Sequence, residues 1–66
     1  MNITLNGQPR TIPGRMFLRD LVTQFSKTPE VVIAEVNGAI IPKEDWASTQ
    51  MNPEDRIELV AFVGGG

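Results

Sequence analysis

The sequence contains no cysteine and no histidine. Without cysteine the chain can form neither disulfide bonds nor thiolate nucleophiles, and without both residues it lacks the two best ligands for transition metals. Histidine is also the commonest general base in enzymes, so its absence excludes most catalytic constellations. We therefore expect no bound metal or cofactor and no catalytic site of the chain's own.

Basic residues and long apolar runs are scarce as well. Six Lys and Arg stand against eight Asp and Glu, a net charge of −2, and the basic residues are scattered, whereas nucleic acids and anionic membranes require clusters of them. The longest apolar run, residues 59–63, is far shorter than the ~18 residues of a membrane helix. The start at residues 1–4 lacks the basic and apolar regions of a signal peptide. These features predict a cytoplasmic protein that binds neither nucleic acid nor membrane.

The length and composition indicate one small folded domain. The 66 residues are enough for a single domain, residues 1–66, and 41% of them are hydrophobic while 21% are charged. A chain of this size buries only about 60% of the surface that its unfolded form exposes, so the core is thin. The carboxylate pairs Glu44-Asp45 and Glu54-Asp55 lie in expected turns, and we interpret them as solvated surface charges.

Two Asn-Gly pairs mark tight turns, because this dipeptide favours the positive φ angles of a short hairpin. The first, Asn6-Gly7, is expected to join a strand at residues 2–6 to a short strand between Pro9 and Pro13 that the prolines confine to a sheet edge. The second, Asn37-Gly38, is expected to join strands at residues 31–36 and 39–41. A last strand is predicted over residues 56–63.

One helix is predicted between the hairpins, and the proline at position 29 follows its end. Five apolar residues form its stripe and are all expected in the core: Phe17, Leu18, Leu21, Val22 and Phe25. A short helical turn at residues 43–47 brings Trp46 to one end of that core.

This order of elements predicts an α+β fold. About five strands form a mixed sheet, and the main helix packs on one face. A crossover helix places the last strand beside the first and parallel to it, with the hairpin partners outside. This is the ubiquitin-like β-grasp arrangement.

The glycines that follow the last strand predict a flexible tail over residues 63–66. Glycine has no Cβ, so Gly64, Gly65 and Gly66 can pass through a narrow channel and present the terminal carboxylate to a second protein. Three residues reach at most about 10 Å, so the partner must also hold the domain itself. Val60 and Phe62, on the strand face opposite Ile57 and Leu59, are the expected docking surface. The alternatives are an unstructured, inert tail, and Val60 and Phe62 side chains that pack under a loop or on a second core layer.

Three segments resemble the ThiS family, the sulfur carriers of thiamine biosynthesis within the ubiquitin-like β-grasp group. They are residues 3–7, residues 36–46 and residues 55–66 with the Gly tail. In two respects the chain differs. The family usually has a glycine before the aspartate ahead of the last strand, and here that position is Glu54. The family feature at the end is the pair Gly65-Gly66, and Gly64 is an extra small residue before it.

The resemblance implies that Gly66 is the reacting residue and that Gly65 and Gly64 thread it into the partner. An E1-like adenylating enzyme would use ATP and magnesium to convert the Gly66 carboxylate to an acyl-adenylate. Sulfur from a persulfide donor would displace AMP, and the resulting thiocarboxylate would supply thiazole synthase. The docking surface expected from the strand pattern, Val60 and Phe62 with Glu58 at its rim, would hold this partner. The chain itself would be no enzyme and would bind no cofactor.

Other functions remain open for a chain with this fold and tail. One is a carrier like the small subunit of molybdopterin synthase, and another is a ubiquitin-like modifier joined to other proteins through Gly66. A third is an interaction domain whose tail is inert. For a carrier that visits two partners in turn, we expect a monomer with weak, reversible contacts.

Overall fold

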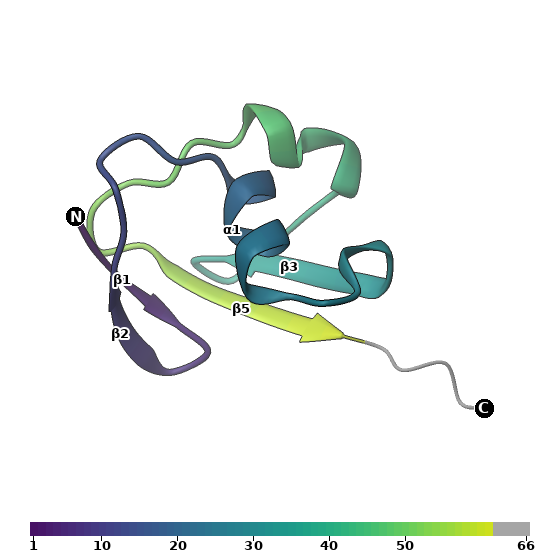
Figure 1. Ribbon diagram of the computed structural model, residues 1–66, viewed down its shortest axis with the longest axis horizontal. Helices are drawn as coiled ribbons and strands as arrows, with labels where there is room; N and C mark the ends of the chain where they lie inside the picture. The colour runs from purple at the N-terminus through teal and green to yellow at the C-terminus, as the bar shows by residue number, and fades with distance from the viewer. Residues whose placement is uncertain (62–66) are drawn as a thin grey trace.

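A computed structural model describes residues 1–61, and residues 62–66 lie outside the described part. Within residues 1–61 the chain forms a five-stranded sheet in the order β2-β1-β5-β3-β4, crossed on one face by α1 (Figure 1). The elements are β1 (Asn2–Leu5), β2 (Gln8–Thr11), α1 (Leu18–Phe25), η1 (Pro29–Val31), β3 (Val32–Val36), β4 (Ala39–Ile41), η2 (Lys43–Ser48) and β5 (Arg56–Ala61).

The sheet topology confirms the α+β fold with the ubiquitin-like β-grasp arrangement. β5 pairs in parallel with β1, where Thr4 lies opposite Arg56, and antiparallel with β3 on its other side. β2 and β4 are the edges, as the hairpin order predicted. The edge strand β2 covers residues 8–11 rather than 9–13, and Pro9 fits within it because an edge strand leaves one row of N–H groups unpaired.

Both Asn-Gly pairs form the expected turns. Asn6 and Gly7 have φ angles of 49° and 79°, and Asn37 and Gly38 have 51° and 88°. Each asparagine also binds β5: Asn6 Oδ1 accepts the N–H of Leu59 at 2.8 Å, and Asn37 Oδ1 accepts that of Arg56 at 2.9 Å. The two hairpin turns therefore fix β5 from opposite sides.

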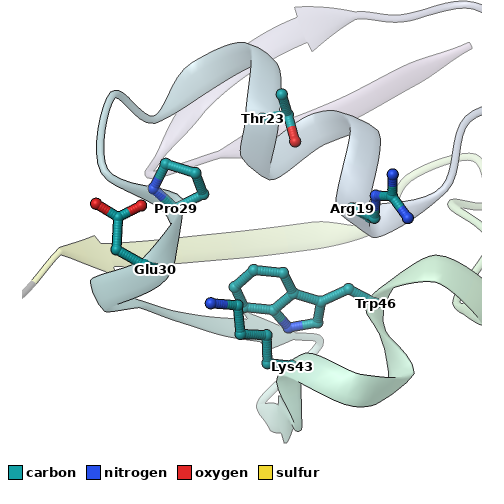
Figure 2. Close-up of a pocket in the computed structure, with 6 residues that line it drawn as sticks. All are labelled: Arg19, Thr23, Pro29, Glu30, Lys43 and Trp46. Carbon is teal, nitrogen blue, oxygen red and sulfur yellow. The ribbon is translucent and has the colours of Figure 1, made fainter.

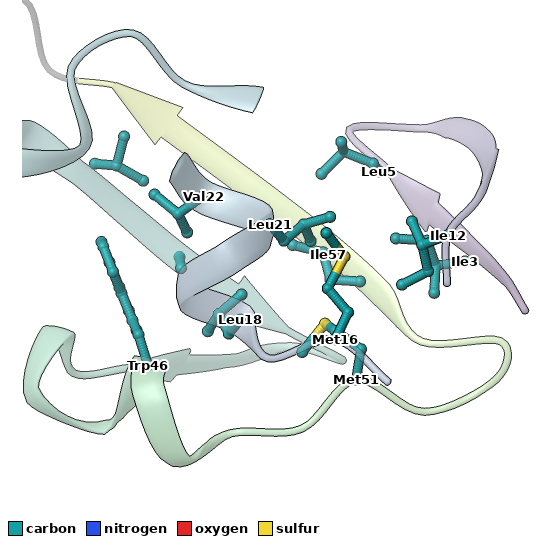
Figure 3. Close-up of a cluster of buried hydrophobic side chains, with 12 residues drawn as sticks. Ile3, Leu5, Ile12, Met16, Leu18, Leu21, Val22, Trp46, Met51 and Ile57 are labelled. Carbon is teal, nitrogen blue, oxygen red and sulfur yellow. The ribbon is translucent and has the colours of Figure 1, made fainter. Parts of the chain in front are cut away.

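The core lies between α1 and the sheet. Leu18, Leu21 and Val22 of the helix are fully buried, and they pack against apolar side chains of the strands. Trp46 lies at one end of the cluster, with Ile3 and Ile12 at the other (Figure 3). The Trp46 indole N–H donates to the carbonyl oxygen of Ile41 at 2.9 Å, so its one polar atom is satisfied. The prediction that Trp46 caps the core is confirmed.

Two helix residues predicted to be in the core lie at its margin. Phe17 and Phe25 are 39% and 37% exposed. Phe17 precedes the first helical residue with an extended backbone, and Phe25 is the last helical residue, so both rings lie beyond the part of α1 that covers the sheet. The guanidinium of Arg10, on edge strand β2, lies 5.2 Å from the centre of the Phe25 ring. Two loop methionines, Met16 and Met51, are buried in the core.

Candidate functional site

The residues of β5 alternate between two faces of the sheet. Ile57 is fully buried under α1 and Leu59 packs against the core. Glu58, which is half-buried, and Val60, which is 51% exposed, therefore face the opposite side, as the sequence predicted. The other predicted site residues, Phe62, Gly64, Gly65 and Gly66, lie outside the described residues.

Neighbouring strands extend this surface beyond the predicted residues. Ile33 of β3 lies opposite Val60, and Glu35 lies opposite both Glu58 of β5 and Ile40 of β4. Ile33 and Ile40 are 40% and 65% exposed. We call this surface the outer face. Its residues are Ile33, Glu35, Ile40, Glu58 and Val60.

This face also holds three residues that are not among the predicted docking residues: Ile33, Glu35 and Ile40. The alternation of β3, with Val32 and Ala34 buried, places Ile33 on the other side. That signal is present in the sequence, but only the pairing register brings Ile33 beside Val60. The register also places Glu58 among outer-face residues rather than at the rim, because β5 is the middle strand of the sheet.

The outer face lies close along the chain to the predicted reacting group. Val60 precedes Gly66 by six residues. Six residues span at most about 20 Å. A partner that covers Val60 and Ile33 would therefore have Gly66 within reach of its own reactive groups.

A buried carboxylate fixes the start of β5. Asp55 is 7% exposed and accepts the N–H of Asn52 at 2.7 Å and the Nδ2–H of Asn37 at 2.9 Å. Its interpretation as a solvated surface charge is therefore wrong. The turn at residues 52–55 brings the Asp55 carboxylate to the N–H of Asn52, the first residue of that turn. The same carboxylate also meets the Asn37 side chain in the turn between β3 and β4. Glu54, Glu44 and Asp45 are exposed, as expected.

A surface pocket of about 270 Å³ lies between α1 and η2 (Figure 2). Six residues line it: Arg19, Thr23, Pro29, Glu30, Lys43 and Trp46. Its charged groups do not converge, because the Arg19 guanidinium and the Glu30 carboxylate lie at opposite ends of the pocket (Figure 2). Ligand sites typically have polar groups aimed at one point, so the lining of this pocket gives no support for a ligand site.

Among residues 1–61, no group of three or more His, Cys, Asp or Glu side chains could hold a metal ion. In the same range, every helix is too short or too polar to cross a membrane.

Comparisons with known proteins agree with this architecture. The crystal structure of the thiamine biosynthesis protein ThiS from Geobacter metallireducens superposes with a TM-score of 0.84, at 30% identity, covering 100% of both chains. The sulfur carrier protein ThiS of Bacillus subtilis (strain 168) is 39% identical over 49 residues, 74% of each chain. The thiazole synthase of Paramagnetospirillum magneticum is 33% identical over 66 residues, so the chain spans only 20% of that protein's length.

The family comparison covers nearly the whole chain. The model of the ThiS family matches residues 3–66, which include all of β1 except its first residue, the sheet centre and the glycines at the end of the sequence. With this match and the Bacillus relative, the chain belongs to the ThiS family.

Proposed function

We propose that this chain serves as a sulfur carrier in thiamine biosynthesis and carries the sulfur as a thiocarboxylate on the Gly66 carboxyl group. An E1-like adenylating enzyme uses ATP and magnesium to join AMP to that carboxyl group. The terminal sulfur of a persulfide donor then displaces AMP to form an acyl disulfide, and a thiol reduces its S–S bond to release the thiocarboxylate and a disulfide. The thiocarboxylate supplies thiazole synthase with sulfur for the thiazole ring.

The observation that supports this function most strongly is the family match over residues 3–66, which includes the Gly tail. A second observation supports thiazole synthase as the acceptor. A region similar to all 66 residues forms part of thiazole synthase polypeptides from two bacteria, Paramagnetospirillum magneticum and Magnetococcus marinus. Joining two domains in one chain raises their effective concentration for each other, which favours proteins that act in succession.

The chemistry of the chain suits a carrier rather than a catalyst. The reacting group in this proposal is the main-chain carboxylate, so neither cysteine nor histidine is needed. The partner enzymes supply the catalytic groups, ATP and magnesium. The chain supplies a rigid domain, a docking surface and an unhindered tail.

The docking surface in this proposal is the outer face together with Phe62. Its exposed apolar side chains, Ile33, Ile40 and Val60, lie on the sheet face opposite the core. The ribbon shows that α1 crosses only the other face (Figure 1). Exposed apolar groups gathered on one face are typical of protein contacts. Gly65 and Gly64 thread Gly66 into the active site of the docked enzyme.

Intact-mass measurement tests the proposal. After incubation with the adenylating enzyme, ATP, magnesium, and a sulfide source, we expect a mass gain equal to exchange of one oxygen for sulfur. Deletion of Gly65 and Gly66 should abolish the gain, and so should Gly65→Val, because a side chain blocks the channel. Gly14→Val is the matched control, since a Cβ at Gly14 meets nothing within 4 Å.

Each outcome separates this function from its alternatives. A full mass gain in the Gly65→Val variant would contradict the threading of the tail. Higher-mass conjugates of the chain in cell extract, without a thiocarboxylate, would instead identify a ubiquitin-like modifier.

A further inference from the structure

We infer that Glu35 and Glu58 determine which protein docks on the outer face, because they require the adenylating enzyme to place an arginine or lysine side chain between them. This inference rests on the proposed function, which assigns the outer face to docking. It adds the chemistry of the contact: a basic side chain flanked by apolar contacts.

The two carboxylates are direct neighbours across two strands. Glu35 of β3 lies opposite Glu58 of β5 in the antiparallel register. Residues so paired have Cβ atoms roughly 4.5–5.5 Å apart, and like charges in this position destabilise a sheet. Both residues are half-buried, so water screens them only in part. The fold thus keeps an unfavourable pair where a neutral residue would be more stable.

Apolar groups flank this acidic pair toward β4 and toward the C-terminal end of β5. Ile40 lies directly opposite Glu35 on β4, and Ile33 precedes Glu35 by two residues on the same face. Val60 follows Glu58 by two residues. A partner that covers Ile33, Ile40 and Val60 must also cover both carboxylates.

A partner that covers Glu35 and Glu58 needs a positive charge at this point of its surface. Removing water from two unpaired carboxylates is costly, so a purely apolar partner surface would bind weakly. A guanidinium can donate to two carboxylates at once, and an ammonium can lie between them. Either group converts the repulsion into attraction.

The chain's own cations fill this role only in part. Arg56 is the other charged residue that the described strands place on this side, two residues before Glu58 and opposite Thr4. It adjoins Glu58 along β5 and lies diagonally across from Glu35 on β3, a separation that a long side chain can span. One cation beside two carboxylates still leaves this part of the face with a net negative charge, which a basic side chain of the partner would neutralise.

The acidic pair also disfavours a second copy of the chain on this face. Two copies docked face to face would bring four carboxylates together. Like-charge contacts of this kind suppress wrong partners at interfaces. A basic enzyme surface is therefore the occupant that fits both the apolar residues and the charges.

The test measures the affinity of the intact chain for the adenylating enzyme at several salt concentrations. Glu35→Gln and Glu58→Gln should each weaken binding roughly tenfold, because each removes a charge-assisted hydrogen bond. The double variant should also lose most of the salt dependence of binding. Glu44→Gln, an exposed glutamate on η2, removes the same charge elsewhere and should bind as the wild type does.

The unfolding temperature provides a second measurement, and we expect it not to fall in the variants that lose affinity. The double variant should unfold at the same or a higher temperature than the wild type, because a repulsive pair has been removed. A weakened affinity therefore cannot be explained by loss of the fold.

Two results would overturn the inference. One is a double variant that binds as tightly as the wild type with unchanged salt dependence, and the other is a wild-type dimer formed through the outer face. The wild-type mass gain at saturating enzyme is measured in parallel. If that gain occurs while the glutamate variants bind normally, this inference fails and the proposed function stands.

Discussion

At the scale of single residues, Glu54 has a backbone conformation that suits glycine. Its φ is 69°, in the left-handed region, where a Cβ costs roughly 1–2 kcal/mol. The turn holds this conformation through the Glu54 N–H, which donates to the Asn2 carbonyl oxygen at 2.7 Å. The ThiS family usually has glycine at this position, because glycine adopts a positive φ without the steric cost of a Cβ.

Glu54→Gly should therefore stabilise the fold. We expect a gain of about 0.5–1 kcal/mol, less than the full strain because glycine also gains freedom in the unfolded chain. Thermal and urea unfolding measure the change. Glu54→Ala is the control, since it removes the charge but keeps the Cβ. A glycine variant no more stable than the alanine variant would contradict the account of strain.

Replacement of the buried Asp55 should instead destabilise the fold. Asp55→Ala leaves the N–H of Asn52 and the amide of Asn37 without their acceptor. The cost should be about 2–3 kcal/mol of unfolding free energy, the usual penalty for buried groups that lose a charged partner. Asp45→Ala, which removes an exposed carboxylate, should cost far less. Equal costs in the two variants would show that the Asp55 contacts contribute nothing.

At the scale of elements, local signals predicted the turns, whereas packing decided the helix ends. Asn6-Gly7 and Asn37-Gly38 need only their own backbone preferences, so the sequence predicts them correctly. The helical period that marks Phe17 and Phe25 as apolar does not say how far the sheet extends beneath α1. Both rings therefore lie at the margin of the core.

Local sequence patterns likewise predict only part of the outer face. Alternation within β5 predicts the side of Glu58 and Val60, because it is a property of one strand. Glu35 meets Glu58 only through the register between β3 and β5, which joins residues far apart in the chain. No local pattern contains that information.

Variants of neighbouring residues on β3 and β5 should show that docking and folding depend on different side chains. Ile33→Thr with Val60→Thr keeps the β-branched shape, so stability should change by less than about 1 kcal/mol. Affinity for the adenylating enzyme should fall roughly tenfold, as for central apolar contacts of an interface. Val32→Thr, at an 8% exposed position, should instead lower stability and leave the affinity of the folded protein unchanged. The reverse pattern would place the docking surface elsewhere.

At the scale of the whole molecule, the two faces of the sheet have different roles, one in the stability of the fold and the other in the proposed recognition of a partner. α1 and the core occupy one face, and the outer face is left for a partner (Figure 1). β5 lies in the middle of the sheet, is bound by both hairpin turns, and is the last described element before Phe62 and the glycines. The fold and the family could be predicted from the sequence. The role of Gly66 and its partners stays a prediction, because it depends on chemistry between proteins.

The central claim is that sulfur resides on Gly66, and fragmentation of the intact product in a mass spectrometer tests it most directly. The chain is treated with the adenylating enzyme, ATP, magnesium and a sulfide source before it is fragmented. We predict that every fragment containing Gly66 has one oxygen replaced by sulfur and that fragments ending before Gly66 are unchanged. Sulfur found on fragments that lack Gly66, or an unmodified chain beside an enzyme shown to be active, would contradict the account.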